Sequence, residues 1–380
     1  MILPDATLGV LGGGQLGRMF AIAARTLGYR VWVLDPDPES PAGAMADVHL
    51  RADYGDHAAL SQLAAACHAI TTEFENVPAE TLEFLERRAP VRPGSVAVAI
   101  ARDRIAEKTF LRDQGLATAP FVAIHATGEL ESACTLLTLP ALLKTARFGY
   151  DGKGQVSVDN LDEAIAGFES LNRVPCVLEE RVALKQELSV ILARGTDGHM
   201  AFYPVADNVH RNGILHTTRV PASLPAGIGE LAVEMAGRLA EALNYCGVLA
   251  VEFFLTRDEE LLINEMAPRP HNSGHFTLDA CVTSQFEQQV RALCGLPLGD
   301  TRLLSPVVML NLLGDLWRHD RPPPWQAIFE TVGARLHLYG KKTAPAGRKM
   351  GHVNCLASDI EKAAATAESL FGMLSDQSDR

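Results

Sequence analysis

The chain has 380 residues, of which 47% are hydrophobic and 21% charged, as in an ordinary globular protein. Its formal net charge of -12 argues against a nucleic-acid partner, whose phosphates require a basic surface. The seven cysteines are scattered without a C-x-x-C pair, which predicts neither a disulfide framework nor a thiolate zinc site. With no basic leader and no apolar run of about 18 residues, we expect a cytoplasmic protein without membrane contact.

Residues 1–100 alternate between predicted strands and helices, which is typical of a parallel sheet with helical crossovers. Ligands of such sheets bind where the strands end, here at a glycine turn, at Asp35, and at the pair Glu73 and Glu75. We expect strands at 7–12, 30–35 and 68–74, and helices at 14–28, 57–67 and 79–88.

The glycine turn, with Gly12, Gly14 and Gly17, has the G-x-G-x-x-G spacing of a dinucleotide site. Asp35 closes the next predicted strand, about where a ribose-binding acid would lie. The same spacing serves any tight turn from a first strand into a helix. The turn alone therefore leaves a nicotinamide-dependent oxidoreductase open.

After residue 100, helices are interspersed with strands that are predicted to be antiparallel. A cationic helix carries Arg104, and two short strands at 140–158 enclose a glycine-rich loop. A long helix at 227–244 precedes a hairpin at 247–268, and we expect residues 301–380 to form a small β-rich appendage. The pattern predicts a chain of mixed α/β and α+β class.

The hairpin at 247–268 predicts a specific register. A turn centred between Asp258 and Glu259 places Glu252 opposite Glu265. Like charges directly across a ladder are destabilising, and the apolar neighbours argue against simple exposure. The same register pairs Leu255 with Leu262 and Phe254 with Ile263.

A divalent cation between Glu252 and Glu265 would reverse the sign of that interaction. The side chains of Asn264 and Asn272 offer further oxygens, and an all-oxygen set suits magnesium bound together with substrate phosphates. The pattern therefore predicts a magnesium site. An edge hairpin with both carboxylates in solvent is the alternative.

The loop at 149–155 contains three glycines, which allow backbone amides to approach an anion closely. Lys153 lies within the loop, and Lys144 precedes it in an apolar strand, where a buried lysine needs an anionic partner. The spacing is not that of a P-loop. We interpret the loop as a phosphate-binding loop, with a plain hairpin turn as the alternative.

Three further segments carry polar side chains suited to ligands. Residues 178–182 end an apolar strand in consecutive acids, where an adenine could lie with Glu187 near its ribose. Residues 267–275 bring Arg269 and His271 beside the hairpin, and residues 339–352 hold a basic cluster typical of a phosphate site. A structural turn and a solvated loop are the alternatives for the last two.

Taken in order, these segments resemble the ATP-grasp superfamily and, within it, the N5-carboxyaminoimidazole ribonucleotide synthase family of purine biosynthesis. The matching stretches are GGGQLGRM, TTEFENV, RDRIAEK, GYDGKGQ, EERV, YPVADNVHRNGIL, LLINEMAPRPHNSGH and GRKMGH. The resemblance implies a Rossmann-like domain at 1–100, an ATP-grasp domain at 101–300 with a lid subdomain at about 118–183, and a small β-rich domain at 301–380. It also argues against the nicotinamide interpretation.

The resemblance implies site residues position by position. ATP would be bound by Arg104, Lys144, Gly149, Tyr150, Asp151, Gly152, Lys153, Gly154, Gln155, Glu179, Glu180, Arg181, Val182, Glu187, His210, Asn264 and Glu265. Magnesium would be bound by Glu252 and Glu265. The ribonucleotide would be bound by Gly14, Gln15, Leu16, Glu73, Lys341, Arg348 and Lys349. Catalysis would involve Arg269, His271, Asn272, Tyr150 and Asp151.

The implied reaction is the ATP-dependent carboxylation of 5-aminoimidazole ribonucleotide with bicarbonate, through carboxyphosphate, in a homodimer whose partners are small molecules. One position departs from the family, because Pro345 stands where an arginine is frequent and Lys341 or Lys342 would have to replace its phosphate contact. The alternatives are a formate-dependent glycinamide ribonucleotide transformylase, a biotin carboxylase and a non-catalytic nucleotide sensor.

Overall fold

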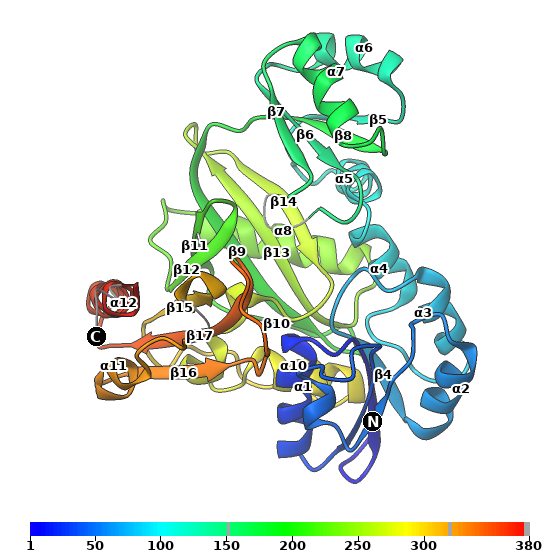
Figure 1. Cartoon of the computed structure of the whole chain (residues 1–380), viewed down its shortest axis with the longest axis vertical. Helices are drawn as coiled ribbons and strands as arrows, with labels where there is room; N and C mark the ends of the chain where they lie inside the picture. The colour runs from blue at the N-terminus through cyan, green and yellow to red at the C-terminus, as the bar shows by residue number, and fades with distance from the viewer. Residues whose placement is uncertain (150–152, 318–320, 376–380) are drawn as a thin grey trace.

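The computed structural model describes residues 1–149, 153–317 and 321–375, which fold around three β-sheets (Figure 1). The N-terminal sheet has four strands from the first hundred residues, and the lid sheet has four strands from residues 121–180. The central sheet has nine strands and takes up the rest. In Figure 1 the lid sheet lies at one end of the molecule and the N-terminal sheet towards the other.

The N-terminal sheet runs in the order β3-β2-β1-β4 with parallel neighbours, which confirms the predicted alternation. α1 packs on one face together with α10 (Gln285–Cys294), while α2 and α3 share a second core with the sheet. The elements are β1 (Thr7–Leu11), α1 (Gln15–Thr26), β2 (Arg30–Leu34), β3 (Val48–Leu50), α2 (His57–Ala66), β4 (Ala69–Thr72) and α3 (Ala79–Glu86).

The glycine turn after β1 closes on acidic side chains of its own sheet. The Glu73 carboxylate accepts hydrogen bonds from the backbone amides of Gly14 and Gly17, the latter at 2.9 Å. Asp35 accepts one from the amide of Gly13 at 2.7 Å. A dinucleotide pyrophosphate would need these same amides at the start of α1. The glycine spacing therefore serves internal packing, which argues against a nicotinamide site.

The lid sheet is antiparallel, with the order β5-β8-β6-β7. It has its own core, in which Leu143 and Leu178 of the strands meet Phe168 of α7. β6 and β7 are the two strands that were predicted to enclose the glycine-rich loop. The elements are β5 (Phe121–Ile124), α6 (Leu130–Leu136), β6 (Ala141–Thr145), β7 (Gln155–Val158), α7 (Leu161–Ser170) and β8 (Cys176–Glu180).

The central sheet runs in the order β14-β13-β9-β11-β12-β15-β17-β16, with β10 paired to β9. Because β15 pairs with β12, the β-rich C-terminal segment continues this sheet instead of forming a separate one. The domain boundaries at 100 and 300 stay predictions. The strands are β9 (Leu184–Arg194), β10 (Met200–Phe202), β11 (Ala206–Arg211), β12 (Ile214–Val220), β13 (Gly247–Thr256), β14 (Leu261–Ala267), β15 (Val307–Leu313), β16 (Ala334–Leu338) and β17 (Lys349–Leu356).

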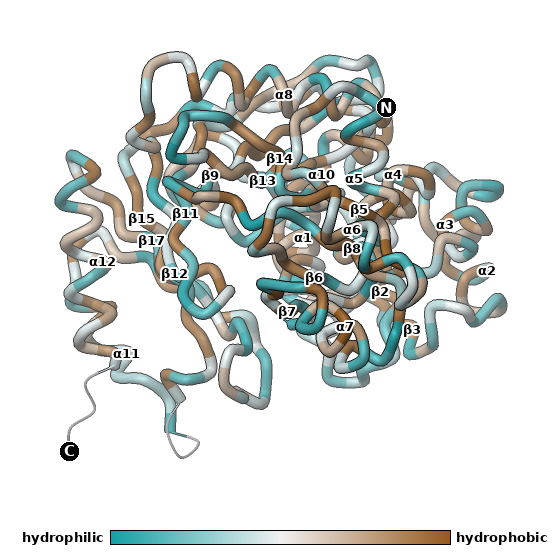
Figure 2. Tube along the Cα trace, turned by 90° about the horizontal axis from the view of Figure 1, so that it is seen from above, coloured by the Kyte–Doolittle hydropathy of each residue, from teal (hydrophilic) through white to brown (hydrophobic). Residues whose placement is uncertain are grey.

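Helices cover the central sheet. α8 (Ile228–Ala242) packs on it through an apolar stripe that includes Met235 and Leu239, and α11 (Trp325–Glu330) and α12 (Ile360–Ser375) pack on its C-terminal strands. Figure 2 shows α11 and α12 on one side of the molecule and α2 and α3 on the opposite side. None of the helices in the described ranges has the length and apolar character to cross a membrane. The remaining helices are η1 (Gly43–Met45), α4 (Ser95–Ala101), α5 (Arg104–Asp113), η2 (Thr127–Glu129), η3 (Asn272–Gly274), α9 (Thr277–Ala280) and η4 (Gly314–Leu316).

The hairpin of β13 and β14 confirms one predicted pair and corrects two. Glu252 faces Glu265, as expected. The pairs nearer the turn are displaced by one residue on β14, so this part of the predicted register was wrong. Leu255 pairs with Leu261 instead of Leu262, and Phe254 pairs with Leu262 instead of Ile263.

Two irregularities explain this register. The turn closes through a hydrogen bond of 2.9 Å from the amide of Thr256 to the carbonyl of Glu260, with Glu259 in the left-handed region at a φ of 63°. A β-bulge then inserts Asn264 as an extra residue of β14, so the two acids regain their alignment. The asymmetric turn displaces the register by one residue, and the bulge displaces it back by one. The symmetric turn assumed from the sequence therefore predicts the acid pair correctly, because these two displacements cancel.

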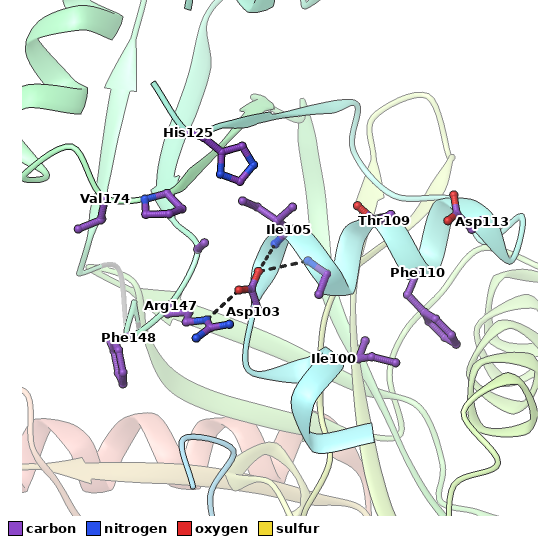
Figure 3. Close-up of a pocket in the computed structure, with 13 residues that line it drawn as sticks. Ile100, Asp103, Ile105, Thr109, Phe110, Asp113, His125, Arg147, Phe148 and Val174 are labelled. Carbon is purple, nitrogen blue, oxygen red and sulfur yellow. Dashed lines mark hydrogen bonds and ion pairs between the residues drawn. The ribbon is translucent and has the colours of Figure 1, made fainter. Parts of the chain in front are cut away.

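The lid sheet meets the rest of the chain at the N-terminus of α5 (Figure 3). Asp103 caps this helix by accepting hydrogen bonds from the amides of Ile105 and Ala106 at 3.0 and 3.2 Å, and its other oxygen binds Arg147 Nε at 2.8 Å. An apolar cavity of about 990 Å³ lies beside this contact. Among the described residues, those that line it include none of the predicted site residues.

We expect Gly14→Ala to destabilise the protein by about 1–3 kcal/mol. A Cβ at this position would lie 2.4 Å from Glu73 Oε1 and would displace the carboxylate from the amides that it caps. Gly372→Ala is the matched control, because Gly372 lies within α12 with open space around it, and this change should stabilise by about 0.5–1 kcal/mol. Thermal unfolding measures both, and equal melting temperatures would contradict the capping role of Glu73.

Candidate active site

The three sheets surround a polar cavity of about 490 Å³. It is lined by α5, by β6 of the lid sheet, by the hairpin of β13 and β14, and by the start of β17. Predicted residues from distant parts of the chain therefore converge on one space. Those that line it are Arg104, Lys144, Gly149, Gln155, Glu187, His210, Glu252, Asn264, Glu265, Arg269, His271, Asn272 and Lys349.

The facing acids Glu252 and Glu265 each have a basic partner from another segment. Arg104 Nη1 lies 2.9 Å from Glu265 Oε2, and His271 Nε2 lies 3.2 Å from Glu252 Oε1. Burial, and then the neighbouring Glu265, raise the pKa of Glu252. Burial also acts to raise the pKa of Glu265, but Arg104 outweighs it and holds that pKa below its ordinary value. One acid of the pair is thus held ionised while the other binds a proton more tightly than usual.

The oxygens around this pair fit a magnesium ion. Asn264 Oδ1 and Asn272 Oδ1 are buried and accept no hydrogen bond from the described residues. Two carboxylates with two amide oxygens form an oxygen-only donor set, which suits a hard cation that shares its remaining ligands with phosphates. Within the described ranges, no group of three or more His, Cys, Asp or Glu is arranged to hold a metal by itself. The magnesium site at Glu252 and Glu265 stays a prediction.

Helix α5 presents three ionisable side chains on one face, at Arg104, Glu107 and Lys108, because residues spaced by three and four lie together on a helix. Glu107 Oε1 accepts a hydrogen bond of 2.5 Å from the amide of Met266, next to the acid pair. Burial raises the pKa of Glu107 to about 8. Neither Glu107 nor Lys108 was predicted to be a site residue, although the spacing within RDRIAEK was a usable signal.

The buried lysine of β6 has an anionic partner, as the sequence led us to expect. Lys144 Nζ lies 2.8 Å from Glu179 Oε2, and Lys108 Nζ lies 2.7 Å from Glu179 Oε1. The Glu179 carboxylate, predicted to lie near an adenine, is therefore bound between two lysines. Glu180 Oε1 accepts a hydrogen bond of 2.7 Å from the amide of Thr138. In the described structure, the cavity lining does not include Glu179, Glu180, Arg181 or Val182.

Strands β9 and β11 bring Glu187 and His210 together, with 2.5 Å between Glu187 Oε2 and His210 Nδ1. Burial acts to lower the pKa of His210, but the hydrogen bond and charge of Glu187 outweigh it and raise that pKa. The two side chains form an ion pair in the cavity wall. A carboxylate in this place is suited to accept hydrogen bonds from sugar hydroxyls.

The loop after β14 is fixed by hydrogen bonds on both sides. Arg269 Nε lies 2.6 Å from Glu75 Oε2, which joins the loop to the end of β4. Gln285 accepts a hydrogen bond from the amide of His271 at 2.9 Å and donates one to its carbonyl at 2.7 Å. Burial, and then Arg269, lower the pKa of His271 well below 6.5, so its imidazole is neutral. His271 Nδ1 lies 2.9 Å from Ser273 Oγ.

The residues predicted to bind the ribonucleotide fall into two groups. Lys349 lines the cavity. Lys341 Nζ instead donates to Gln15 Oε1 at 2.6 Å, and Arg348 Nη1 donates to Thr343 Oγ1 at 2.6 Å. The other predicted members, Gly14, Leu16 and Glu73, lie at the capped start of α1 and outside the described lining.

The turn around Pro345 supplies no cation at that position. The Pro345 carbonyl packs so closely on Gly314 that a Cβ there would lie 2.1 Å from it. Of the two lysines expected to compensate, Lys342 pairs with Glu39 and Lys341 with Gln15. Their role in binding a phosphate stays a prediction.

The glycine-rich loop is described in part. Tyr150, Asp151 and Gly152 lie outside the described residues, and their roles stay predictions. Gly154 has a φ of 73°, and a Cβ there would lie 2.7 Å from Thr145 Oγ1, so the return of the loop to β7 requires glycine. Lys153 is exposed. Of the loop residues that the structure describes, Gly149 and Gln155 line the cavity.

Comparisons with known families cover most of the chain. Residues 5–102 match the ribonucleotide synthetase preATP-grasp domain, and residues 109–286 match the ATP-grasp domain. Residues 307–366 match the phosphoribosylaminoimidazole carboxylase C-terminal domain. These matches confirm the predicted fold class.

This chain is similar to known proteins over nearly its whole length and nearly theirs. The N5-carboxyaminoimidazole ribonucleotide synthase of Bacillus subtilis (strain 168) is 46% identical over 93% of this chain and 92% of its own. A crystal structure of an N5-carboxyaminoimidazole ribonucleotide synthetase with ADP has a TM-score of 0.91 and 43% identity, covering 98% of this chain and 97% of that one. The Aspergillus clavatus enzyme with ADP and 5-aminoimidazole ribonucleotide has a TM-score of 0.89 and 31% identity, covering 97% and 98%.

The stability of the protein should depend on pH through Glu107. Its pKa of about 8 in the folded state exceeds the ordinary value of 4.5, so its contribution is full below 4.5 and is lost as the pH rises through 8. Glu107→Gln retains an acceptor for the Met266 amide but cannot ionise. Melting temperatures are measured without divalent cations at about pH 5 and about pH 8.5. The melting temperature of the variant, relative to that of the wild type, should be higher at about pH 8.5 than at about pH 5. A constant difference would show that Glu107 ionises as it does in water.

Proposed function

The chain belongs to the N5-carboxyaminoimidazole ribonucleotide synthase family of ATP-grasp enzymes, and from this we propose that it carboxylates 5-aminoimidazole ribonucleotide with bicarbonate and ATP. The observation that carries the proposal is the facing pair Glu252 and Glu265, which lines a cavity that also contains cations from α5, the lid sheet and β17. The chain is an ATP-dependent ligase of purine biosynthesis, as the sequence predicted.

The nucleotide would lie between the lid sheet and the hairpin. Arg104 and Lys144 offer positive charge to the phosphates from two directions, and Glu187 offers a carboxylate for the ribose hydroxyls. In the first step, an oxygen of bicarbonate attacks the γ-phosphorus of ATP, which yields carboxyphosphate and ADP. Magnesium held by Glu252 and Glu265, with Asn264, would neutralise charge on the phosphoryl oxygens.

In the second step, the exocyclic amine of the ribonucleotide forms a bond to the carboxyl carbon, and phosphate leaves. Either carboxyphosphate or the carbon dioxide that it releases supplies this carbon. The amine loses a proton, and the neutral imidazole of His271 is suited to take it up beside Glu252. Arg269 and Asn272 lie in the same loop and are suited to orient the carboxyl group.

Carboxyphosphate is short-lived in water, so the site has to exclude solvent during the reaction. The loop at 149–155 joins two strands of the lid sheet, and its described residues Gly149 and Gln155 line the cavity. We assign the exclusion of water to this loop.

The proposal also covers the location, the assembly and the domain division of the protein. We place the protein in the cytoplasm, as a homodimer whose partners are small molecules. We divide the chain into the three units at 1–100, 101–300 and 301–380, with the lid subdomain at about 118–183. The family matches at 5–102, 109–286 and 307–366 support this division.

Phosphate release tests the substrate directly. With ATP, magnesium and bicarbonate present, 5-aminoimidazole ribonucleotide should raise the rate of phosphate release by at least about 10-fold. Glycinamide ribonucleotide with formate, and biotin, should leave the rate unchanged. Stimulation by one of these instead would assign the chain to a transformylase or a carboxylase, and no stimulation by any acceptor would favour a nucleotide sensor.

Glu265→Gln should lower turnover by about 100-fold or more, because one carboxylate of the proposed magnesium site becomes neutral. The fold should remain, since Gln has nearly the same shape. Glu259→Gln is the matched control, because Glu259 lies exposed at the turn of the same hairpin and pairs only with Lys185 among the described residues. Turnover of Glu265→Gln at the rate of the control would refute the metal role.

A further inference from the structure

Lys108 is the most buried cation near the candidate active site, with 1% of its side chain exposed. Its Nζ lies 2.7 Å from Glu179 Oε1, 2.9 Å from Thr118 Oγ1 and 3.3 Å from the backbone carbonyl of Asn264. Glu179 belongs to β8 of the lid sheet, and Asn264 is the bulge residue of β14. One ammonium group on α5 thus joins the lid sheet to the hairpin that carries the acid pair.

The contact with Glu179 also determines the net charge of the cluster that Lys108, Glu179 and Lys144 form. Glu179 binds Lys108 through one oxygen and Lys144 through the other, at 2.7 and 2.8 Å. Two ammonium groups therefore share one carboxylate, and the cluster retains one positive charge. Lys144 carries this charge into the cavity, since Lys144 lines it and Lys108 does not. Without Lys108, the charge of Lys144 would be fully compensated by Glu179.

The contact with Asn264 acts on the other half of the site. Asn264 directly precedes Glu265, and its unpaired position in the bulge is what aligns Glu265 with Glu252. A hydrogen bond from Lys108 to its carbonyl therefore fixes the backbone beside the acid pair. The neighbouring residue of α5, Glu107, binds the next amide along β14, that of Met266. The same helix thus fixes the backbone on both sides of Glu265.

We propose that Lys108 is a positioning residue for ATP turnover, which holds Lys144 of the lid sheet and Glu265 of the hairpin in a fixed relation across the cavity. It does not line the cavity, and it acts through Glu179 and Asn264. This inference rests on the proposed function, because it assigns Lys144 to the triphosphate and Glu265 to the metal.

The primary test is Lys108→Met, compared with the wild type in binding and in turnover. The affinity for ATP, measured by calorimetry, should fall about 10-fold, because the cluster around Glu179 loses its net positive charge. The affinity for adenosine should change less than about 2-fold, since adenosine has no phosphate to bind. The kcat of acceptor-dependent phosphate release should fall about 10-fold or more. Lys362→Met is the control, because Lys362 forms an exposed ion pair with Asp359 on the surface.

A second variant separates position from charge, and it also covers the case in which Lys108→Met folds poorly. Lys108→Met combined with Glu179→Gln also removes the carboxylate that would otherwise compensate Lys144, so the positive charge of Lys144 is retained. ATP affinity should return to within about 3-fold of the wild type, while kcat stays at least about 10-fold low because the contact with Asn264 is absent. Lys108→Arg, which can donate to both partners, should recover most of kcat.

Three outcomes would overturn the proposal. A wild-type kcat in the double variant would show that Lys108 acts only by balancing the charge of Glu179, and that its contact with Asn264 is not needed for turnover. Equal weakening of ATP and adenosine binding would indicate general damage to the fold. A low kcat in Lys108→Arg equal to that of Lys108→Met would exclude the hydrogen bonds as the cause. Failure of the proposed function is a different result, because the wild type itself would then show no acceptor-dependent phosphate release.

Discussion

Two carboxylates that face each other inside a protein must both be compensated, and this requirement organises the whole site. Glu252 and Glu265 lie side by side because a bulge in β14 aligns them, and each draws a basic side chain from outside the hairpin. Arg104 reaches Glu265 from α5, and His271 reaches Glu252 from the loop after β14. Arg104 forms an ion pair with Glu265, whereas the neutral His271 contacts Glu252 without a charge of its own. Together the two contacts fix where α5 and the loop lie relative to the hairpin.

Helix α5 also fixes the position of the lid sheet relative to the hairpin. Arg104 and Lys108 are one turn apart on α5, so the partner of Glu265 and the partner of Glu179 move together. A second contact, between Asp103 and Arg147, ties the end of β6 to the start of this helix. The lid sheet is therefore joined to α5 by the ion pairs of Lys108 with Glu179 and of Asp103 with Arg147. The position of the lid is thus set by the helix that also fixes the acid pair.

The sequence predicted most helices and strands, but it predicted contacts between distant residues only in part. The alternation of the first hundred residues follows from local periodicity, which is why it was found. The acid pair was found because the shift at the turn and the bulge at Asn264 cancel. The pairs nearer the turn were displaced because the turn is asymmetric, with Glu259 in the left-handed region. The bulge that restores the alignment of the acids depends on tertiary contacts, such as the one between Lys108 and the Asn264 carbonyl. The partner of Lys144 was anticipated as an anion, but Glu179 lies 35 positions away along the chain and only the fold identifies it. The glycine turn by itself left two interpretations open for a similar reason, since the carboxylate that its amides bind, that of Glu73, follows a strand distant in the sequence.

The balance of charge in the cavity explains how an acidic chain can bind anionic substrates. Among the described residues that line it, Arg102, Arg104, Lys144, Arg269 and Lys349 are cations, and Glu75, Glu107, Glu187, Glu252 and Glu265 are acids. Burial raises the pKa of Glu107 to about 8, and that of Glu252 is raised as well, so fewer than all of these acids are charged near neutral pH. The cavity lining is therefore far less negative than the chain as a whole, whose net charge is -12. A site of this kind favours a metal and a polyphosphate together, because the cation relieves the acid pair while the phosphates meet the remaining positive charge.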